Sequence, residues 1–197
     1  MDRYSTPANR QRFEIEIKRS RFITTVIPVQ DKTAAMTQID SVRQEFPDAN
    51  HHCWAMIAGA PLDTHQQEQN DDGEPKGTAG KPMLNVLLHS GMGNLVVIVT
   101  RYFGGIKLGA GGLVRAYSSS VSGALLQITT ITQYVSVRCL LELPYSQLDI
   151  LEHWLKTGNI MILDREFSDN VVLTLDVPET EVAALRDKAA ELGVTLS

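Results

Sequence analysis

The sequence lacks the features of a membrane protein or a disulfide-stabilised secreted protein. Its uninterrupted apolar runs, such as Leu95–Val99, are far shorter than the roughly 18 residues that span a bilayer. Residues 1–10 are polar and contain no apolar core of a secretory signal. The only two cysteines, Cys53 and Cys139, lie far apart in the chain, as is typical of free thiols in a reducing compartment. We therefore expect a cytoplasmic protein without a membrane association.

Acidic residues are also missing from one long part of the chain. The 23 aspartates and glutamates leave a gap of 66 residues, from Lys76 to Leu141, which carries six basic side chains. The flanking segments 22–75 and 142–197 each have a net charge of -7. The overall charge of -5 gives no reason to expect a nucleic-acid partner, but this distribution favours contact with anions. A solvated, mildly basic face is the alternative.

The hydrophobic pattern predicts an α+β fold with two domains. In the first part of the chain, apolar alternation and helical stripes predict strands at 12–18, 22–29, 53–58 and 94–102 and helices at 31–46, 82–89 and 113–128. After residue 133 the predicted order is β-α-β-β-α-β, the split pattern of ferredoxin-like domains. The polar segment Thr129–Gln133 between them is expected to be an exposed linker. The predicted domains are therefore residues 1–131 and 132–197.

The best candidate for a binding site is the segment 101–115, in which a strand, a glycine-rich loop and a helix start follow one another. Glycines allow backbone N–H groups to approach a ligand, and the first turn of a helix attracts anions. The spacing matches neither a P-loop nor a dinucleotide-binding motif. A turn needed only for strand–helix packing is the alternative. With Tyr102 as a stacking side chain, the candidate anion- or nucleic-acid-binding residues are Lys76, Lys81, Arg101, Tyr102, Gly104, Gly105, Lys107, Gly109, Gly111, Gly112 and Arg115.

A second candidate is the acidic segment that contains Asp71, Asp72 and Glu74. Three carboxylates within four residues could bind a hard cation, but the spacing of a calcium-binding EF-hand loop is absent. A solvated acidic turn is favoured, and no metal is expected. His51 and His52 are neighbours on a predicted strand, so they point to opposite faces and cannot share one ion with the adjacent cysteine. A structural histidine is favoured over a ligand.

Three motifs together resemble the IMPACT family, and most closely its bacterial YigZ-like members. They are His51-His52-Cys53-Trp54-Ala55, Asp71–Pro75 with Gly77–Met83, and Arg101–Gly105 followed by Leu108–Tyr117. The resemblance covers essentially the whole chain. It implies an N-terminal domain of β-α-β type, like the second domain of a small-subunit ribosomal protein. It also implies a C-terminal domain like the last domain of elongation factor G.

The resemblance further implies an RNA- or ribosome-binding regulator of translation. Eukaryotic members compete for an activator of the kinase that phosphorylates eukaryotic initiation factor 2, a pathway that bacteria lack. One alternative is a protein-binding regulator without RNA contact, whose partner is a translation factor or regulatory protein. Another is a small enzyme for a phosphate-bearing ligand, with acid/base or metal chemistry from His52, Asp71, Asp72 or Glu74. GHMP kinases share the N-terminal fold that the resemblance implies, but their Ser-Ser-Ala signature is missing here, so kinase activity is not expected. Binding is favoured over catalysis, and no cofactor is expected.

Overall fold

The computed structural model describes residues 3–196 and divides them into two compact units. The first unit spans Tyr4–Gln133, and the second begins at Tyr134. Each unit combines a sheet with helices and has its own apolar core. The expected α+β class is therefore confirmed.

A five-stranded antiparallel sheet forms the centre of the first unit. Its strand order is β2 (Gln11–Ile17), β3 (Ser20–Pro28), β6 (Leu95–Tyr102), β4 (His51–Ile57) and β5 (Gln67–Asn70). The central strand β6 is buried from Leu95 to Arg101, which explains its uninterrupted apolar sequence. Because β4 and β6 are antiparallel neighbours, with His51 opposite Arg101, the start of β4 and the end of β6 meet at the same end of the sheet.

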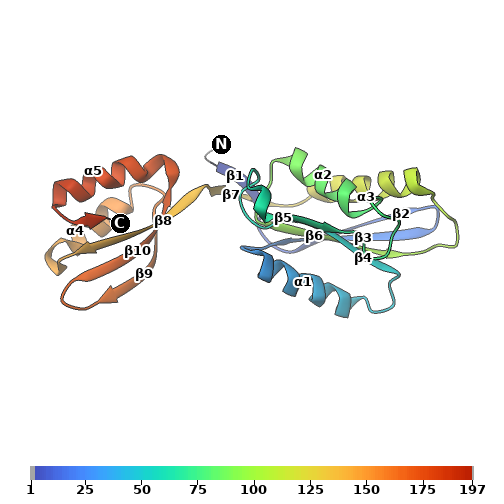
Figure 1. The fold of residues 1–197 in the computed structure, drawn as a ribbon, viewed down its shortest axis with the longest axis horizontal. Coiled ribbons are helices and arrows are strands. Elements are labelled where there is room, and N and C mark those ends of the chain that lie inside the picture. The colour runs from blue at the N-terminus through green and yellow to red at the C-terminus, as the bar shows by residue number, and fades with distance from the viewer. Residues whose placement is uncertain (1–2, 197) are drawn as a thin grey trace. The chain divides into compact units, whose positions relative to one another are not determined.

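Helices cover both faces of this sheet. Helix α1 (Lys32–Glu45) lies on one face, and α2 (Gly80–Ser90) and α3 (Ala110–Leu125) lie on the other (Figure 1). Alternation along β4 sorts its side chains: Cys53 and Ala55 pack under α2 and α3, whereas Trp54 and Met56 pack against α1. Within residues 3–196, no helix is long and apolar enough to cross a membrane.

The second unit has the predicted β-α-β-β-α-β order. Its elements are β8 (Ser136–Leu143), α4 (Tyr145–Leu155), β9 (Met161–Phe167), β10 (Val171–Pro178), α5 (Val182–Leu192) and β11 (Thr195–Leu196). The antiparallel sheet order is β11-β8-β10-β9, with the first and third strands in the middle. Alternate residues of β8 and β10 form a core with α4 and α5. This confirms the predicted C-terminal arrangement.

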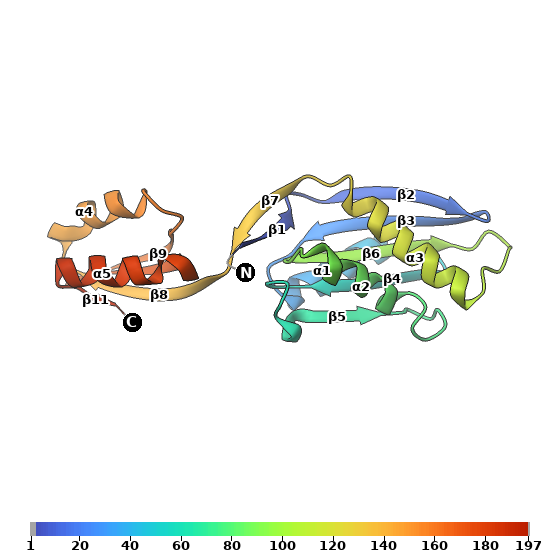
Figure 2. The same ribbon diagram turned by 90° about the horizontal axis from the view of Figure 1, so that it is seen from above.

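The structure adds detail to the expected elements. The segment 129–133 is largely exposed and ends where the first unit ends, as expected of a linker, but β7 (Thr130–Tyr134) also pairs with β1 (Arg3–Pro7) in a two-stranded sheet (Figure 2). The polar region 61–80 contains the short 3-10 helix η1 (Thr64–Gln66) and the edge strand β5. Helix α3 begins at Ala110 rather than Leu113, so two of the glycines lie inside its first turn.

The pairing of β7 with β1 predicts how the first unit responds to truncation. We expect residues 1–134 to fold as an isolated fragment. A fragment that ends at residue 129 should be less stable by at least about 1 kcal/mol, because it leaves the hydrogen-bonding groups of β1 without a partner strand. Urea unfolding of both fragments measures the difference. Equal stability would show that the two-stranded sheet contributes nothing to this unit.

Candidate functional site

A cleft of about 470 Å³ opens at the end of the sheet where β4 starts and β6 finishes. Four segments meet there: the start of β4, the acidic loop before α2, the end of β6, and the glycine-rich segment with the first turns of α3. The lining residues are Asn50, His51, Glu74, Pro75, Arg101, Phe103, Lys107, Leu108, Gly109, Ala110 and Leu113. The cleft therefore joins parts of both sequence candidates, the acidic segment and the glycine-rich segment.

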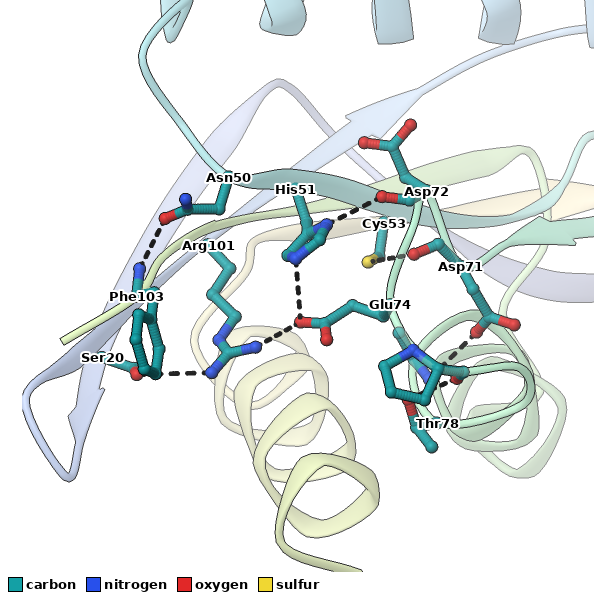
Figure 3. A network of polar contacts seen from close by, with 12 residues as sticks. Ser20, Asn50, His51, Cys53, Asp71, Asp72, Glu74, Thr78, Arg101 and Phe103 are labelled. Carbon is teal, nitrogen blue, oxygen red and sulfur yellow. Dashed lines mark hydrogen bonds and ion pairs between the residues drawn. The ribbon is translucent and has the colours of Figure 1, made fainter. Parts of the chain in front are cut away.

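A buried ion pair forms the floor of the cleft. The side chains of Glu74 and Arg101 are only 3% and 6% exposed, and Arg101 Nη1 donates to Glu74 Oε1 at 2.5 Å. The hydroxyl of Tyr117, on α3, donates to the same oxygen at 2.7 Å. Burial raises the pKa of Tyr117, so its hydroxyl stays protonated and remains a donor. Figure 3 shows Arg101 and His51 turned toward Glu74 from neighbouring strands.

This pair corrects the role expected for Arg101. The sequence suggested a surface cation for phosphates, but its charge is compensated by Glu74, and Nη2 lies 3.5 Å from the Ser20 hydroxyl. The guanidinium also lies 5.4 Å and 5.7 Å from the ring centres of Phe22 and Phe103. Its partner is 27 residues earlier in the chain, outside the acid-free segment, so charge counting along the sequence could not find it.

The two neighbouring histidines lie on opposite faces, and the structure brings His51, not His52, to the cleft. His51 Nδ1 is 2.9 Å from the Asp72 carbonyl oxygen. A carbonyl only accepts hydrogen bonds, so Nδ1 carries the proton and Nε2 faces Glu74 Oε1 at 4.0 Å. His52 is buried on the α1 face, 3.2 Å from the Thr100 hydroxyl. Of the acid/base candidates His52, Asp71, Asp72 and Glu74, only Glu74 lines the cleft. The backbone N–H of His52 instead donates to the Asp72 carboxylate at 2.6 Å.

The acidic segment is held by internal contacts and is not a solvated turn. The Asp71 carboxylate accepts hydrogen bonds from the backbone N–H groups of Gly77, Ala79 and Gly80, at 2.7 to 3.0 Å, and so caps the start of α2. The Asp72 carboxylate points away from Glu74 (Figure 3) and contacts Arg43 at 2.9 Å. Across residues 3–196, no three His, Cys, Asp or Glu side chains are arranged to hold a metal ion.

The start of α3 differs from the start of α2, because no acidic group occupies it. Gly109 precedes the helix with φ 71°, a conformation that favours glycine, and no side chain caps this end or adds a negative charge in the first turn. Lys107, Gly109 and Ala110 line the cleft, so N–H groups and a lysine meet there. Gly111 and Gly112 lie in the first turn of α3.

Two glycines of the predicted site have other surroundings. A Cβ at Gly104 would lie 2.0 Å from the Arg19 carbonyl, so this glycine allows close packing against the turn between β2 and β3. Gly104 therefore has a packing role, but against a turn between strands and not in the strand–helix packing raised as the alternative from the sequence. Gly105 has φ 83°, and a Cβ at this position would meet no atom within 4 Å, so its need for glycine is conformational.

The remaining predicted residues divide between two faces. Lys76 and Arg115 are exposed, and Lys81 lines a groove of about 550 Å³ between α2 and α3. Tyr102 is on the α1 side of the sheet, with the Arg21 guanidinium 5.5 Å from its ring centre. It therefore lies away from the cleft. Phe103, which is 46% exposed, is the aromatic side chain that lines it.

The sequence pattern left several cleft residues outside the candidate set. Phe103 had a usable signal, an aromatic ring between a strand and a glycine pair. Asn50 had none: it lies just before β4, its backbone N–H donates to the Arg101 carbonyl at 3.0 Å, and its side chain accepts a hydrogen bond from the Phe103 backbone N–H at 2.7 Å.

Comparison with known proteins gives consistent matches along the chain. Residues 18–125 match the model of the Impact N-terminal domain, and residues 141–193 match a domain of unknown function (DUF1949). The chain is 44% identical to IMPACT family member YigZ of Escherichia coli, over 90% of this chain and 87% of that protein. It is 40% identical to an IMPACT family member of Haemophilus influenzae, over 97% and 93%. A crystal structure of a hypothetical protein, 41% identical, covers 100% of this chain and 97% of its own, with a TM-score of 0.79.

The cap formed by Asp71 predicts a large loss of stability on its removal. We expect Asp71→Ala to lower the free energy of unfolding by about 2–4 kcal/mol, because three backbone donors near the start of α2 lose a charged acceptor. Asp48→Ala, which removes an exposed carboxylate, is the matched control and should change stability by less than about 0.5 kcal/mol. Urea unfolding compares the two. Similar effects would contradict a capping role.

The buried position of His52 predicts a pH dependence of stability. Desolvation lowers the pKa of His52 below its ordinary value of 6.5. Below that pH the unfolded chain binds a proton that the folded chain does not. The contribution of neutral His52 to the free energy of unfolding is therefore complete above about pH 6.5 and is lost as the pH falls toward the pKa of the folded state. His52→Gln should flatten the decline between pH 7 and 5 in urea unfolding. The exposed-site control, His65→Gln, should keep the wild-type slope.

Proposed function

This chain belongs to the IMPACT family, and from that premise we propose that it binds RNA, including RNA of the ribosome, in the regulation of translation. Such a role belongs to the cytoplasm. The observation that carries the proposal is the face formed by α2 and α3, because neither helix carries a carboxylate. RNA presents a closely spaced row of negative phosphates, so a surface without acidic groups favours it.

The alternation of side chains along the strands explains why carboxylates from other segments do not lie on this face. On β2 the apolar Phe13 and Ile15 pack toward α3, so Glu14 and Glu16 lie on the opposite side. On β5, Glu68 pairs with Lys32 of α1 at 3.3 Å, which places it on that side too. The two acidic groups beside α2, Asp71 and Glu74, are compensated by backbone donors and by Arg101.

The groove between α2 and α3 supplies hydrogen-bond donors as well as charge. Lys81, Asn85 and His89 line it from α2, and Ser118 and Ser122 line it from α3. Lysine, serine and asparagine are typical partners of phosphate and sugar groups, which position a nucleic acid without reading its sequence. Lys107 and Arg115, at the start of α3, extend the basic surface beyond the groove.

The acidic residues elsewhere in the chain favour a single-stranded or folded RNA over duplex DNA. The net charge is -5, and residues 142–197 alone have a net charge of -7. Long-range attraction of duplex DNA is therefore weak, whereas a single strand or a folded RNA can place a few phosphates on one local face.

The salt dependence of binding tests this proposal. With three to five phosphate contacts, we expect a log–log slope of affinity against salt of roughly -2 to -3.5 on a single strand. Lys81→Ala and Arg115→Ala should each flatten the slope by about 0.7 and weaken all sequences similarly. The measurement is binding of the full chain to total RNA and to ribosomal subunits between about 50 and 200 mM salt.

A lysine outside this face provides the control. Lys156 follows α4 in the second unit and is exposed, so Lys156→Ala should retain the wild-type slope. Salt-independent binding, or equal slopes in all variants, would contradict an RNA-binding α2/α3 face. Binding to ribosomal subunits without affinity for free RNA would instead favour a protein partner.

A further inference from the structure

The cleft contains an acceptor that no group of the protein uses. Glu74 makes its contacts with Arg101, Tyr117 and His51 through Oε1 alone. Its second oxygen, Oε2, has no hydrogen-bond partner within residues 3–196, although the side chain is only 3% exposed and lines the cleft. Oε2 is not one of the fully buried polar atoms without a partner, so it reaches the open space of the cleft and can accept a hydrogen bond from a hydroxyl or amino group supplied from outside. Arg101 Nε, in the same lining, is fully buried and has no hydrogen-bond partner in the described part of the chain.

The opposite wall of the cleft suits an anion. The first turn of α3 has N–H groups without a side-chain cap, and Lys107 lines the cleft next to Gly109 and Ala110. Such N–H groups bind phosphate well when a cation is near. Because Arg101 neutralises Glu74, the carboxylate does not exclude a phosphate from the neighbouring wall.

A flat apolar surface is the third feature of the cleft, beside the free acceptor and the wall that suits an anion. Phe103 is 46% exposed and lines the cleft beside Leu108. Its backbone is fixed by the hydrogen bond from its N–H to Asn50. An exposed aromatic ring held in place beside a phosphate-binding wall is typical of sites where a nucleic-acid base stacks.

We propose that this cleft binds one nucleotide, with the phosphate at the start of α3 and Lys107, the base on Phe103, and a hydroxyl or amino group donating to Glu74 Oε2. A free nucleoside monophosphate and a nucleotide of an RNA strand share this chemistry. The site is built from residues other than those of the groove between α2 and α3. It does not depend on that face binding RNA.

The test is calorimetric titration of the full chain with four probes: inorganic phosphate, adenosine, adenosine 5′-monophosphate and a 5′-phosphorylated octaribonucleotide. The monophosphate should bind at least about 10-fold more tightly than phosphate or adenosine, because it engages both walls. Phe103→Leu should weaken the monophosphate about 5- to 100-fold and leave phosphate unchanged. Lys107→Ala should weaken both. Both side chains are exposed, but the Phe103 ring lies 5.7 Å from the Arg101 guanidinium, so unchanged affinity for phosphate is the check that Phe103→Leu leaves the Glu74–Arg101 pair and the cleft intact.

The outcomes separate this proposal from the previous one. Displacement of the octaribonucleotide by the monophosphate identifies RNA as the source of the nucleotide, and tight monophosphate binding without oligonucleotide binding identifies a free nucleotide. Equal affinity for phosphate and monophosphate, or wild-type affinity in Phe103→Leu, would overturn the nucleotide site. Neither result alters the salt slopes of Lys81→Ala and Arg115→Ala, which test the α2/α3 face alone. Lys156→Ala should match wild type with every probe.

Discussion

The ion pair between Glu74 and Arg101 is the interaction on which the geometry of the cleft depends. It connects the loop before α2 to the central strand β6, and Tyr117 brings α3 to the same carboxylate oxygen. Three elements that are separate in sequence are thereby fixed around one atom. Breaking such a pair by removing one partner costs about 3–5 kcal/mol, since a charge is left buried and uncompensated. The loop therefore has little freedom to move away from the sheet.

The same pair changes the meaning of the charge distribution. Arg101 belongs to the acid-free segment but adds no net charge to the surface, because Glu74 compensates it inside the fold. The exposed Lys81, Lys107 and Arg115 instead determine the electrostatic potential at the α2/α3 face. A count of charges along the chain identifies a basic region, whereas the partner of each charge decides where that region meets solvent.

Periodicity predicted most of the elements but not their partners. The apolar alternation of β4 correctly separated His51 from His52, yet no feature of the strand shows which of its faces carries the cleft. The edge strand β5 (Gln67–Asn70) was missed because its polar residues have low strand propensity. The short strand β1 was missed although Tyr4 and Thr6 favour strands, because its partner β7 lies at the other end of the first unit's sequence. Arg101 has its partner in a loop whose path depends on tertiary packing, so local sequence could not assign it.

The position proposed for a bound anion follows from a difference between the starts of α2 and α3. Helices α2 and α3 both begin beside glycines, and the backbone dipoles of both favour an anion at that end. At α2 the anion is Asp71, a residue of the chain itself, so an external phosphate would compete with a covalently held carboxylate. At α3 no residue takes that place, and Lys107 lies beside it. A glycine-rich helix start in a sequence therefore indicates a ligand only after the nearby carboxylates have been assigned their own backbone donors.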